Sequence, residues 1–253
     1  MEDLFGRHAI VTGAGSGVGE AIALELAAKG ARVTVMGRRL EPLEAVAAKS
    51  DRIVAVSADV TDGDGMTRSV EAACAKNGAV DIVVANAGVA ESAPLKTLTE
   101  DKFRDIVDVN LTGVFNTFRA GFEYLNQGPN GRLIAIASIA GLRGYPYISA
   151  YCASKHGVIG LVKSLAVELA TTGVTVNAIC PGYTDTPMLT RTIDTIMDKT
   201  GRSRDQAEES LLKMNPQRRF IQPSEIAATT LWMCGPGGAS VTGQAIALSG
   251  GET

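Results

Sequence analysis

The sequence predicts a doubly wound α/β fold, in which helices cover both faces of a parallel sheet. Short runs rich in Val, Ile and Ala alternate with segments whose apolar residues have helical spacing. Runs that are apolar on both faces and separated by crossover helices are typical of a parallel sheet with right-handed connections. About seven strands are expected, at residues 8–12, 31–36, 53–57, 82–86, 133–138, 174–179 and 245–248.

Helices are predicted between these strands from apolar spacing. After the first strand, Ala21, Leu24 and Ala28 share one helical face. A longer helix of the same kind is expected from Tyr151 to Ala170.

One interval breaks this alternation. After Pro181, about forty residues with an excess of Thr, Asp, Arg and Gln precede Ser224, the expected N-cap of a helix with Glu225 in its first turn. Loops of this length in compact domains are usually functional, so the sequence predicts a substrate lid near residues 184–220.

Length and composition predict one domain over residues 1–253. The chain has no linker, low-complexity segment or internal repeat, and it is 45% hydrophobic and 20% charged. Its net charge of -3 and scattered Lys and Arg argue against a nucleic-acid partner. Glu2 and Asp3 begin the chain without a long apolar run, and no later stretch would span a bilayer. We therefore expect no membrane partner and a cytoplasmic location.

Cysteines and histidines do not form a recognisable site. Cys74, Cys152, Cys180 and Cys234 are widely spaced, and the chain has two histidines. Neither a disulfide framework nor a metal site is predicted. We interpret the cysteines as buried apolar residues, because neither histidine lies in a motif that would pair with a thiol.

A glycine-rich loop, TGAGSGVG, follows the first strand and leads directly into a helix. Such a loop lets the backbone approach a pyrophosphate, whose charge is held by N–H groups at the helix N-terminus. The expected contacts are Gly13, Ser16, Gly17 and Val18. A simple tight turn is the alternative, and the strand–loop–helix context favours a dinucleotide.

Two arginines, Arg38 and Arg39, end the second strand at the place where an NAD-selective protein usually has an acid for the ribose 2'-hydroxyl. A guanidinium can pair bidentately with a 2'-phosphate. We therefore expect NADP(H) to be preferred over NAD(H). The alternative is that both arginines are solvated at the start of the next helix.

Three residues form a candidate catalytic group. Tyr151 and Lys155 are four residues apart and share one helical face, and Ser138 ends the fifth strand. A nearby ammonium favours the phenolate, so we expect Lys155 to lower the pKa of Tyr151. Ser138 would hydrogen-bond a carbonyl oxygen while Tyr151 protonates it and a nicotinamide delivers hydride to carbon. Each residue alone is weak evidence, and their joint occurrence with the glycine loop is strong evidence.

These motifs closely resemble the short-chain dehydrogenase/reductase family, from Thr12 to the C-terminal Gly-Gly pair. The resemblance implies a Rossmann-like fold and an NAD(P)-dependent enzyme that acts on a ketone or a secondary alcohol. It also implies a homotetramer, with the helix from Tyr151 and the C-terminal strand at its interfaces.

The resemblance assigns further residues. Asp59 and Val60 correspond to the adenine contact, and Asn86, Ala87 and Gly88 to a motif that supports the sheet and the cofactor.

Asn110 corresponds to the family asparagine at a helix kink, which holds a water that touches the catalytic lysine and completes a proton relay. Lys155 and Tyr151 are also expected beside the nicotinamide ribose. The segment that contacts the nicotinamide and its carboxamide corresponds to Pro181, Gly182, Thr184 and Thr186.

The substrate pocket is expected to be framed by residues 90–95, 139–147, Tyr183 and residues 188–220, with a largely apolar near side. The C-terminal part is similar to polyketide-type and acyl-thioester ketoreductases, and the length of the lid resembles that of 3-hydroxybutyrate dehydrogenases. Ala140 and Ala90 stand where those dehydrogenases have a His and a Gln, which weakens the interpretation that the substrate is a small free acid.

Five basic residues near the lid are candidates for the phosphate of an acyl carrier or of coenzyme A. They are Arg143, Arg191, Lys199, Arg202 and Arg204. Acids nearby, such as Asp194, Asp198 and Asp205, favour a solvated helix instead.

The sequence therefore predicts a reductase of a ketone or 3-oxoacyl substrate, including an acyl thioester. The alternative is an NAD(H)-linked dehydrogenase that oxidises a secondary alcohol or a 3-hydroxyacyl compound. A cofactor-binding regulator without turnover is disfavoured, because Tyr151 and Lys155 are both present.

Overall fold

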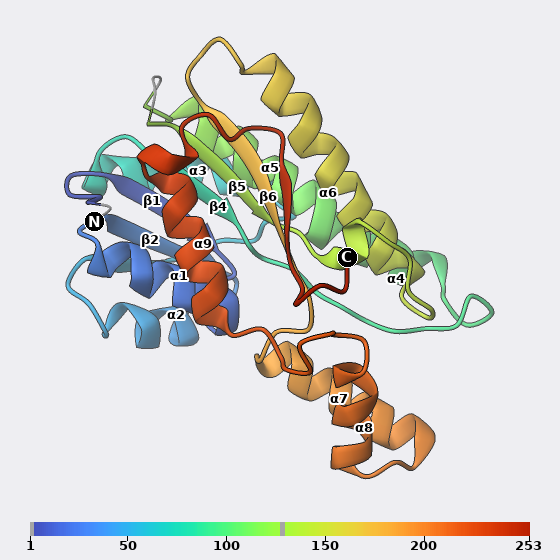
Figure 1. Ribbon diagram of the computed structural model, residues 1–253. Coiled ribbons are helices and arrows are strands. Elements are labelled where there is room, and N and C mark those ends of the chain that lie inside the picture. The colour runs from blue at the N-terminus through green and yellow to red at the C-terminus, as the bar shows by residue number, and fades with distance from the viewer. Residues whose placement is uncertain (1–2, 127–129) are drawn as a thin grey trace.

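The computed structural model describes residues 3–126 and 130–253. These residues contain a seven-stranded parallel sheet in the order β3-β2-β1-β4-β5-β6-β7 (Figure 1). The predicted doubly wound fold is confirmed. Its strands are β1 His8–Thr12, β2 Arg32–Gly37, β3 Ile53–Ser57, β4 Ile82–Ala85, β5 Arg132–Ile136, β6 Thr175–Pro181 and β7 Ala245–Leu248.

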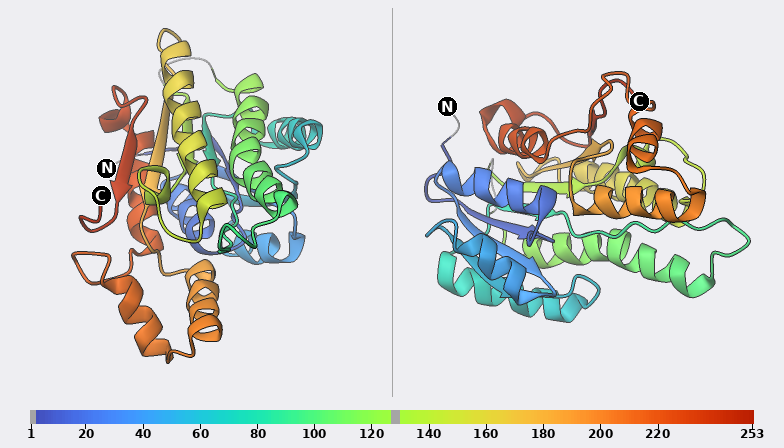
Figure 2. Two further views of the ribbon diagram at one scale, coloured as in Figure 1. Left: turned by 90° about the vertical axis from the view of Figure 1, so that its right-hand side faces the viewer. Right: turned by 90° about the horizontal axis from the view of Figure 1, so that it is seen from below.

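Helices connect the strands and form a layer on each face of the sheet (Figures 1 and 2). The helix expected from Tyr151 to Ala170 begins two residues earlier and is the longest of the described helices. The helices are α1 Gly17–Ala28, α2 Leu40–Ala47, α3 Gly63–Asn77, α4 Glu100–Val107, α5 Gly113–Glu123, α6 Ser149–Glu168, α7 Pro187–Thr200, α8 Arg204–Leu212 and α9 Pro223–Cys234.

Alternation along each strand divides the core into two layers. In β1, Ala9 and Val11 pack toward α1, α2 and α9, whereas Ile10 packs toward α3, α5 and α6. All three side chains are fully buried. The central strands are therefore apolar on both faces, which explains their continuous apolar runs.

The strand order reverses between β1 and β4, which lie side by side in the sheet. In an open parallel sheet, the loops at the carboxyl ends of two such strands diverge and leave a crevice for ligands. The glycine loop after β1 and the segment after β4 both lie at this point.

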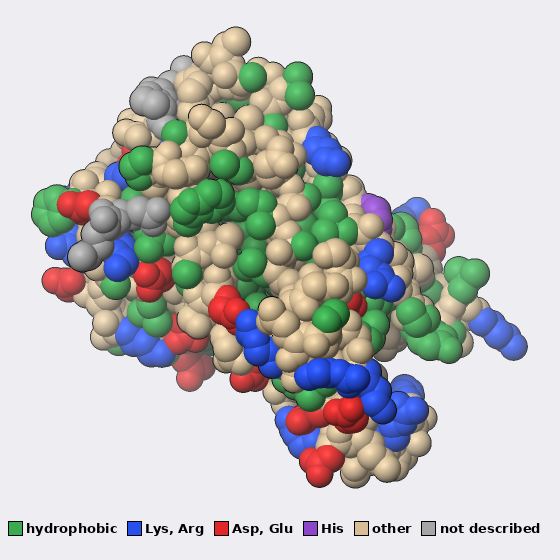
Figure 3. All heavy atoms as spheres, in the orientation of Figure 1, with side chains coloured by type: hydrophobic (Ala, Val, Ile, Leu, Met, Phe, Trp, Pro, Cys, Tyr) green, Lys and Arg blue, Asp and Glu red, His purple; other side chains and the backbone are tan. Residues whose placement is uncertain are grey.

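The expected lid is an α-helical hairpin, α7–α8, which projects from the body at the bottom of Figure 1. Leu189 and Ile193 of α7 pack against Ala207 and Leu211 of α8 in a small separate cluster. Figure 3 shows basic and acidic side chains side by side over this hairpin. Most of its surface is thus solvated, and its apolar contacts are mainly internal.

The predicted start of α9 is wrong by two residues. Gln222, rather than Ser224, is the N-cap, and Pro223 occupies the first helical position. Proline is preorganised for that position, because its φ is fixed and its missing N–H would have no helical partner. Glu225 lies in the first turn as expected and completes a capping box with Gln222.

Candidate functional site

A cleft of about 610 Å³ opens at the carboxyl ends of the strands. It runs from the ends of β2 and β3, past the glycine loop, to β5, α6 and the start of α7. Every catalytic or cofactor-binding residue that the sequence assigned lines this cleft except Gly17 and Asn110. From the ranges expected to frame the substrate pocket, the lining residues are Ala90, Ile139, Ala140, Tyr145, Met188, Leu189, Arg191 and Thr192. Lining residues that the sequence did not assign include Ile136, Ala137 and Ile148. Ile136 and Ala137 directly precede Ser138, and Ile148 directly follows the expected range 139–147, so proximity to the strand and loop ends was the available signal.

The glycine loop is shaped for close approach by a ligand. Gly13 and Gly17 have φ angles of +65° and +60°, in the left-handed region that favours glycine. A Cβ atom at position 13 would lie 2.7 Å from the Cα atom of Ala87. Ser16 is the N-cap of α1 and makes no side-chain capping bond. The first N–H groups of α1 therefore have no side-chain cap from Ser16, and such groups beside the cleft-lining Ser16 and Val18 fit a pyrophosphate.

Asn86 ties this loop to the neighbouring strand. Its side-chain Nδ2 donates to the backbone oxygens of Thr12 at 2.9 Å and Gly13 at 3.1 Å. The hydroxyl of Thr12 accepts from the N–H groups of Asn86 at 3.1 Å and Ala87 at 3.2 Å. These bonds support the loop across the switch point, with Gly88 next along the cleft wall. Thr12 is a supporting residue that the sequence analysis did not assign.

The ends of β2 and β3 form the distal part of the cleft, with Arg38, Arg39, Asp59 and Val60 on its wall. The Asp59 carboxylate accepts bonds from the backbone N–H and the hydroxyl of Thr61. The Thr61 N–H lowers the pKa of Asp59, and the Arg38 guanidinium adds a smaller effect in the same direction. Both arginines are exposed, so their side chains remain accessible to a ligand.

Ser138, Tyr151 and Lys155 meet at the opposite end of the cleft. Ser138 follows β5 and accepts a bond from the Ala140 N–H at 3.1 Å. Lys155 is buried, and its Nζ lies 5.7 Å from the centroid of the Tyr151 ring. The same Nζ donates to the backbone oxygen of Ile136 at 2.9 Å, which fixes the ammonium behind the phenol.

Burial sets the titration of this group. It raises the pKa of Tyr151 to about 12, while a hydrogen bond with Ser138 acts in the opposite direction. Burial also lowers the pKa of Lys155 to about 8. The expected lowering of the Tyr151 pKa is therefore wrong for this structure. Desolvation disfavours the phenolate, and this effect exceeds that of the hydrogen bond with Ser138, which favours it.

Asn110 lies behind the cleft wall, in a π-helical turn, Asp108–Thr112, between α4 and α5. Its Nδ2 donates to the backbone oxygen of Val89 at 2.9 Å and to the Ser154 hydroxyl at 3.1 Å. Its Oδ1 accepts from the Val89 N–H at 2.8 Å. The side chain thus anchors the segment after β4 to α6, and its role in a proton relay stays a prediction.

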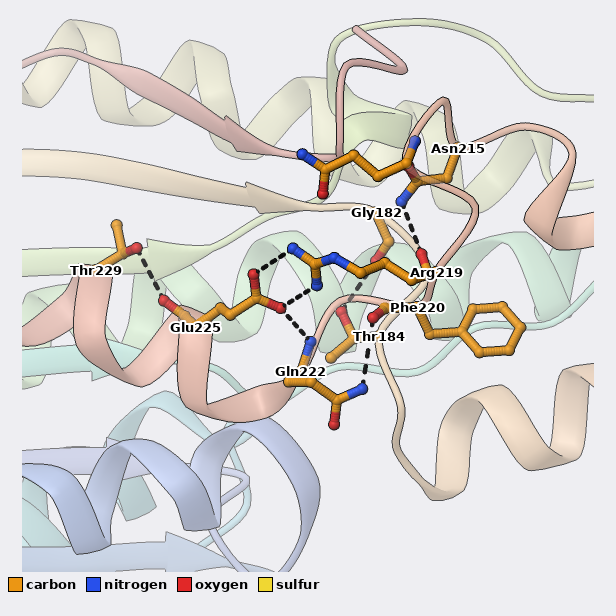
Figure 4. Close-up of polar contacts among 9 residues, drawn as sticks. Gly182, Thr184, Asn215, Arg219, Phe220, Gln222, Glu225 and Thr229 are labelled. Carbon is orange, nitrogen blue, oxygen red and sulfur yellow. Dashed lines mark hydrogen bonds and ion pairs between the residues drawn. The ribbon is translucent and has the colours of Figure 1, made fainter.

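The segment after β6 follows the cleft from Pro181 to Thr186 (Figure 4 shows Gly182 and Thr184). The Thr184 hydroxyl donates to the Gly182 oxygen at 3.0 Å, and the Thr186 hydroxyl donates to the Thr184 oxygen at 3.1 Å. Both hydroxyls use their protons locally and keep lone pairs for a ligand donor such as a carboxamide.

The part of the cleft beyond Ser138 has a mixed wall. Ala90, Ala140 and Met188 line it, together with the phenols of Tyr145 and Tyr183. Tyr145 donates to the carboxylate of Glu252 at 2.5 Å. Burial and this bond raise the pKa of Tyr145, so its hydroxyl stays neutral.

The described residues contain no cluster of His, Cys, Asp or Glu able to hold a metal ion. Across residues 3–126 and 130–253, no helix is both long enough and apolar enough to cross a membrane.

Comparisons with known proteins agree with this geometry. The family model of the short chain dehydrogenases matches residues 7–196. A 3-oxoacyl-(acyl-carrier-protein) reductase of Thermotoga maritima is 34% identical over 252 residues, which cover 98% of each protein. A D-beta-hydroxybutyrate dehydrogenase of Rhizobium meliloti is 34% identical over 254 residues, also 98% of each. The crystal structure of a variant actinorhodin polyketide ketoreductase with NADPH has a TM-score of 0.91 at 36% identity and covers 97% of each chain.

The matched region contains the glycine loop and the Ser138, Tyr151 and Lys155 group, and the relatives match nearly the whole length of this chain. The chain therefore belongs to the short chain dehydrogenase family and is an NAD(P)-dependent oxidoreductase that acts on C=O and CH–OH groups.

Proposed function

We propose that the protein is an NADP(H)-preferring reductase of neutral 3-oxoacyl compounds, such as thioesters, and of related ketones. The observation that carries the proposal is the meeting of Ser138, Tyr151 and Lys155 at one end of the cleft that the glycine loop also lines. Burial raises the pKa of Tyr151, so its phenol is protonated at neutral pH and can donate to a ketone oxygen.

The cofactor would lie along the cleft, where a bound nicotinamide supplies the hydride. The amides around Gly13, Ser16 and Val18 would hold its pyrophosphate, and Lys155 would contact its nicotinamide ribose. Arg38 and Arg39 would pair with a 2'-phosphate. Both are exposed on the cleft wall, and within the described residues neither has a carboxylate at ion-pair distance.

The chain's own groups supply the proton. Ser138 and Tyr151 donate hydrogen bonds to the ketone oxygen and hold the carbonyl carbon toward the cofactor. As negative charge develops on that oxygen, Tyr151 gives it the phenolic proton, and the substrate becomes the alcohol. Lys155, with a pKa of about 8, is mostly charged at neutral pH and stabilises the resulting phenolate. The phenolate then regains a proton from solvent, and Asn110 is proposed to support this relay.

The substrate class is supported by the wall beyond Ser138. Ala90 and Ala140 carry no charge or hydrogen-bonding side chain, so they offer no clamp for a free carboxylate. Tyr145 on this wall donates to the carboxylate of Glu252, whose negative charge would repel an anionic substrate. A neutral thioester or ketone is therefore favoured over a free 3-oxo acid.

We further propose a homotetramer that uses α6 and the edge strand β7. In support, Val167 of α6 is 80% exposed, and β7 ends the sheet with one unpaired edge. Multi-angle light scattering that gives the mass of a monomer would overturn this assembly.

Nucleotide binding and reduction test the proposed function. Calorimetric or fluorescence titration of the wild type with NADPH and NADH should show tighter binding of NADPH, and Arg38→Ala should remove most of the difference. With NADPH, acetoacetyl-coenzyme A should be reduced with a higher kcat/KM than free acetoacetate. A preference for NADH, or for the free acid, would instead favour the NAD(H)-linked dehydrogenase.

A further inference from the structure

One basic residue of the lid lines the cleft. Arg191 of α7 lies on the cleft wall, whereas Lys199 and Arg202, also exposed, lie outside it. Arg204 pairs with two carboxylates of its own hairpin, and Arg143 donates to a C-terminal backbone oxygen and stacks on a tyrosine. Within residues 3–126 and 130–253, Arg191 has no carboxylate at ion-pair distance. Among these five basic residues, Arg191 is therefore the one that lines the cleft.

The first turn of α7 touches the glycine loop. Thr186 is the N-cap of α7, and Pro187 is its first residue. A Cβ atom at Gly17 would lie 3.1 Å from Cγ2 of Thr186 and 3.8 Å from Cδ of Pro187. The N-termini of α1 and α7 therefore meet at the loop that is shaped for the pyrophosphate.

The position of Arg191 in α7 directs its side chain to this loop. It lies four residues after Pro187, on the same helical face and about 6 Å further along the axis. Helical side chains lean toward the N-terminus and cover the preceding turn. This lean carries the Arg191 side chain back toward Pro187 and the start of α7, whose first turn meets the glycine loop.

The base of the lid is held in place by the contacts in Figure 4. Arg219 makes two bonds of 2.6 and 2.7 Å with Glu225, which anchors the returning arm of the lid to α9. The two arms are joined where the Asp185 N–H donates to the Ile221 oxygen and the Ile221 N–H donates to the Tyr183 oxygen, both at 2.9 Å. With this fixed base, the hairpin beyond it makes mainly internal contacts. A contact from Arg191 to a bound ligand would dock the hairpin on the cleft.

We propose that Arg191 binds the pyrophosphate of the dinucleotide and thereby docks the α7–α8 hairpin over the loaded cleft. This inference rests on the proposed dinucleotide binding. A guanidinium matches two phosphate oxygens bidentately, and a pyrophosphate shared by two helix N-termini still has oxygens to offer. Because NADPH and NADH share the pyrophosphate, the contribution of Arg191 is the same for both, unlike that of Arg38.

Asp185 lines a shallow outer hollow together with Arg191. Asp194, three residues after Arg191 in α7, pairs with Arg204. Asp185 offers a competing partner for the guanidinium. If Arg191 served only to pair with Asp185, Asp185→Asn would reproduce the effects of Arg191→Ala. If Arg191 binds the pyrophosphate, Asp185→Asn retains nucleotide affinity or increases it.

The test is the dissociation constant of NADPH and of NADH, measured by calorimetry without substrate. Arg191→Ala should weaken both by a similar factor of about ten, the loss of one charge-assisted contact. Arg191→Lys should restore part of the affinity, and Arg202→Ala, a change of the same kind outside the cleft, should match the wild type. NADPH should slow hydrogen exchange in α7 and α8 of the wild type and of Arg202→Ala, but not of Arg191→Ala.

Several results would overturn this assignment. One is equal nucleotide affinity in Arg191→Ala and Arg202→Ala. Another is a loss confined to NADPH, which would place Arg191 at the 2'-phosphate. A third is unchanged nucleotide affinity with a raised KM for acetoacetyl-coenzyme A alone, which would assign Arg191 to a phosphate of the substrate. Failure of the wild type to bind either nucleotide would overturn the proposed function itself.

Discussion

Replacing Gly13 with alanine tests whether the glycine loop has the backbone conformation that brings it to the cofactor. Gly13 has a φ of +65°, and alanine in this left-handed region costs about 1–2 kcal/mol. The new Cβ would also lie 2.7 Å from the Cα of Ala87 and 3.0 Å from its nitrogen. Both atoms belong to the backbone after β4, so the strain is relieved only if the loop moves.

The two costs together give a loss of about 3 kcal/mol in the free energy of unfolding, with typical overpacking as the second contribution. For a chain of this size, that loss corresponds to a fall in Tm of about 6–12 °C. Displacement of the loop also removes amide contacts to the pyrophosphate, so the Kd for NADPH should rise at least about tenfold.

The assay is thermal unfolding by circular dichroism, together with calorimetric titration of NADPH. Gly160→Ala is the matched control, because Gly160 lies inside α6 and a Cβ there would have no atom within 4 Å. Alanine in a helix interior stabilises the helix by about 0.5–1 kcal/mol relative to glycine, and Gly160 lies outside the cleft, so this variant should keep the wild-type Kd for NADPH. Wild-type Tm and Kd values in Gly13→Ala would refute the argument from strain and close contact.

Two further changes test the proton donor and the anchor of the lid. Tyr151→Phe removes the proton donor, so kcat for ketone reduction should fall about a thousandfold. The Kd for NADPH should change less than about twofold. A kcat within tenfold of the wild-type value would exclude Tyr151 as the acid. Glu225→Gln breaks the pair of bonds with Arg219. The side chains of Glu225 and Arg219 are 38% and 46% exposed, so water screens their attraction, and the loss in unfolding free energy at pH 7 should be about 1 kcal/mol. The Arg219 side chain lowers the pKa of Glu225 from 4.5 to about 2, so this contribution is complete above pH 4.5 and disappears as the pH falls toward 2. Urea unfolding of the wild type and of Glu225→Gln at pH 7 and pH 3 measures this contribution. If the two proteins differed in unfolding free energy by the same amount at both pH values, the low pKa of Glu225 could not be the source of the difference.

Much of the fold and of the candidate site is encoded in short-range patterns. The apolar runs that predicted the strands are needed because helices cover both sides of the sheet, as the two core layers around β1 show. The spacing of Tyr151 and Lys155 places both on one turn of α6 whatever the rest of the chain does. Glycine at position 13 likewise indicates a tight turn from local geometry alone.

Tertiary structure decided what depends on burial and on contacts between distant segments. The Tyr151 pKa moves opposite to the expected direction, because the energy of a phenolate depends on how much water surrounds it, which residue spacing does not reveal. Asn110 faces Val89 rather than the cleft, and Arg191 reaches the cleft wall only because the start of α7 is set against Gly17. Sequence periodicity determines which face of an element is apolar, whereas the chain path around the β1–β4 switch point determines which side chains meet.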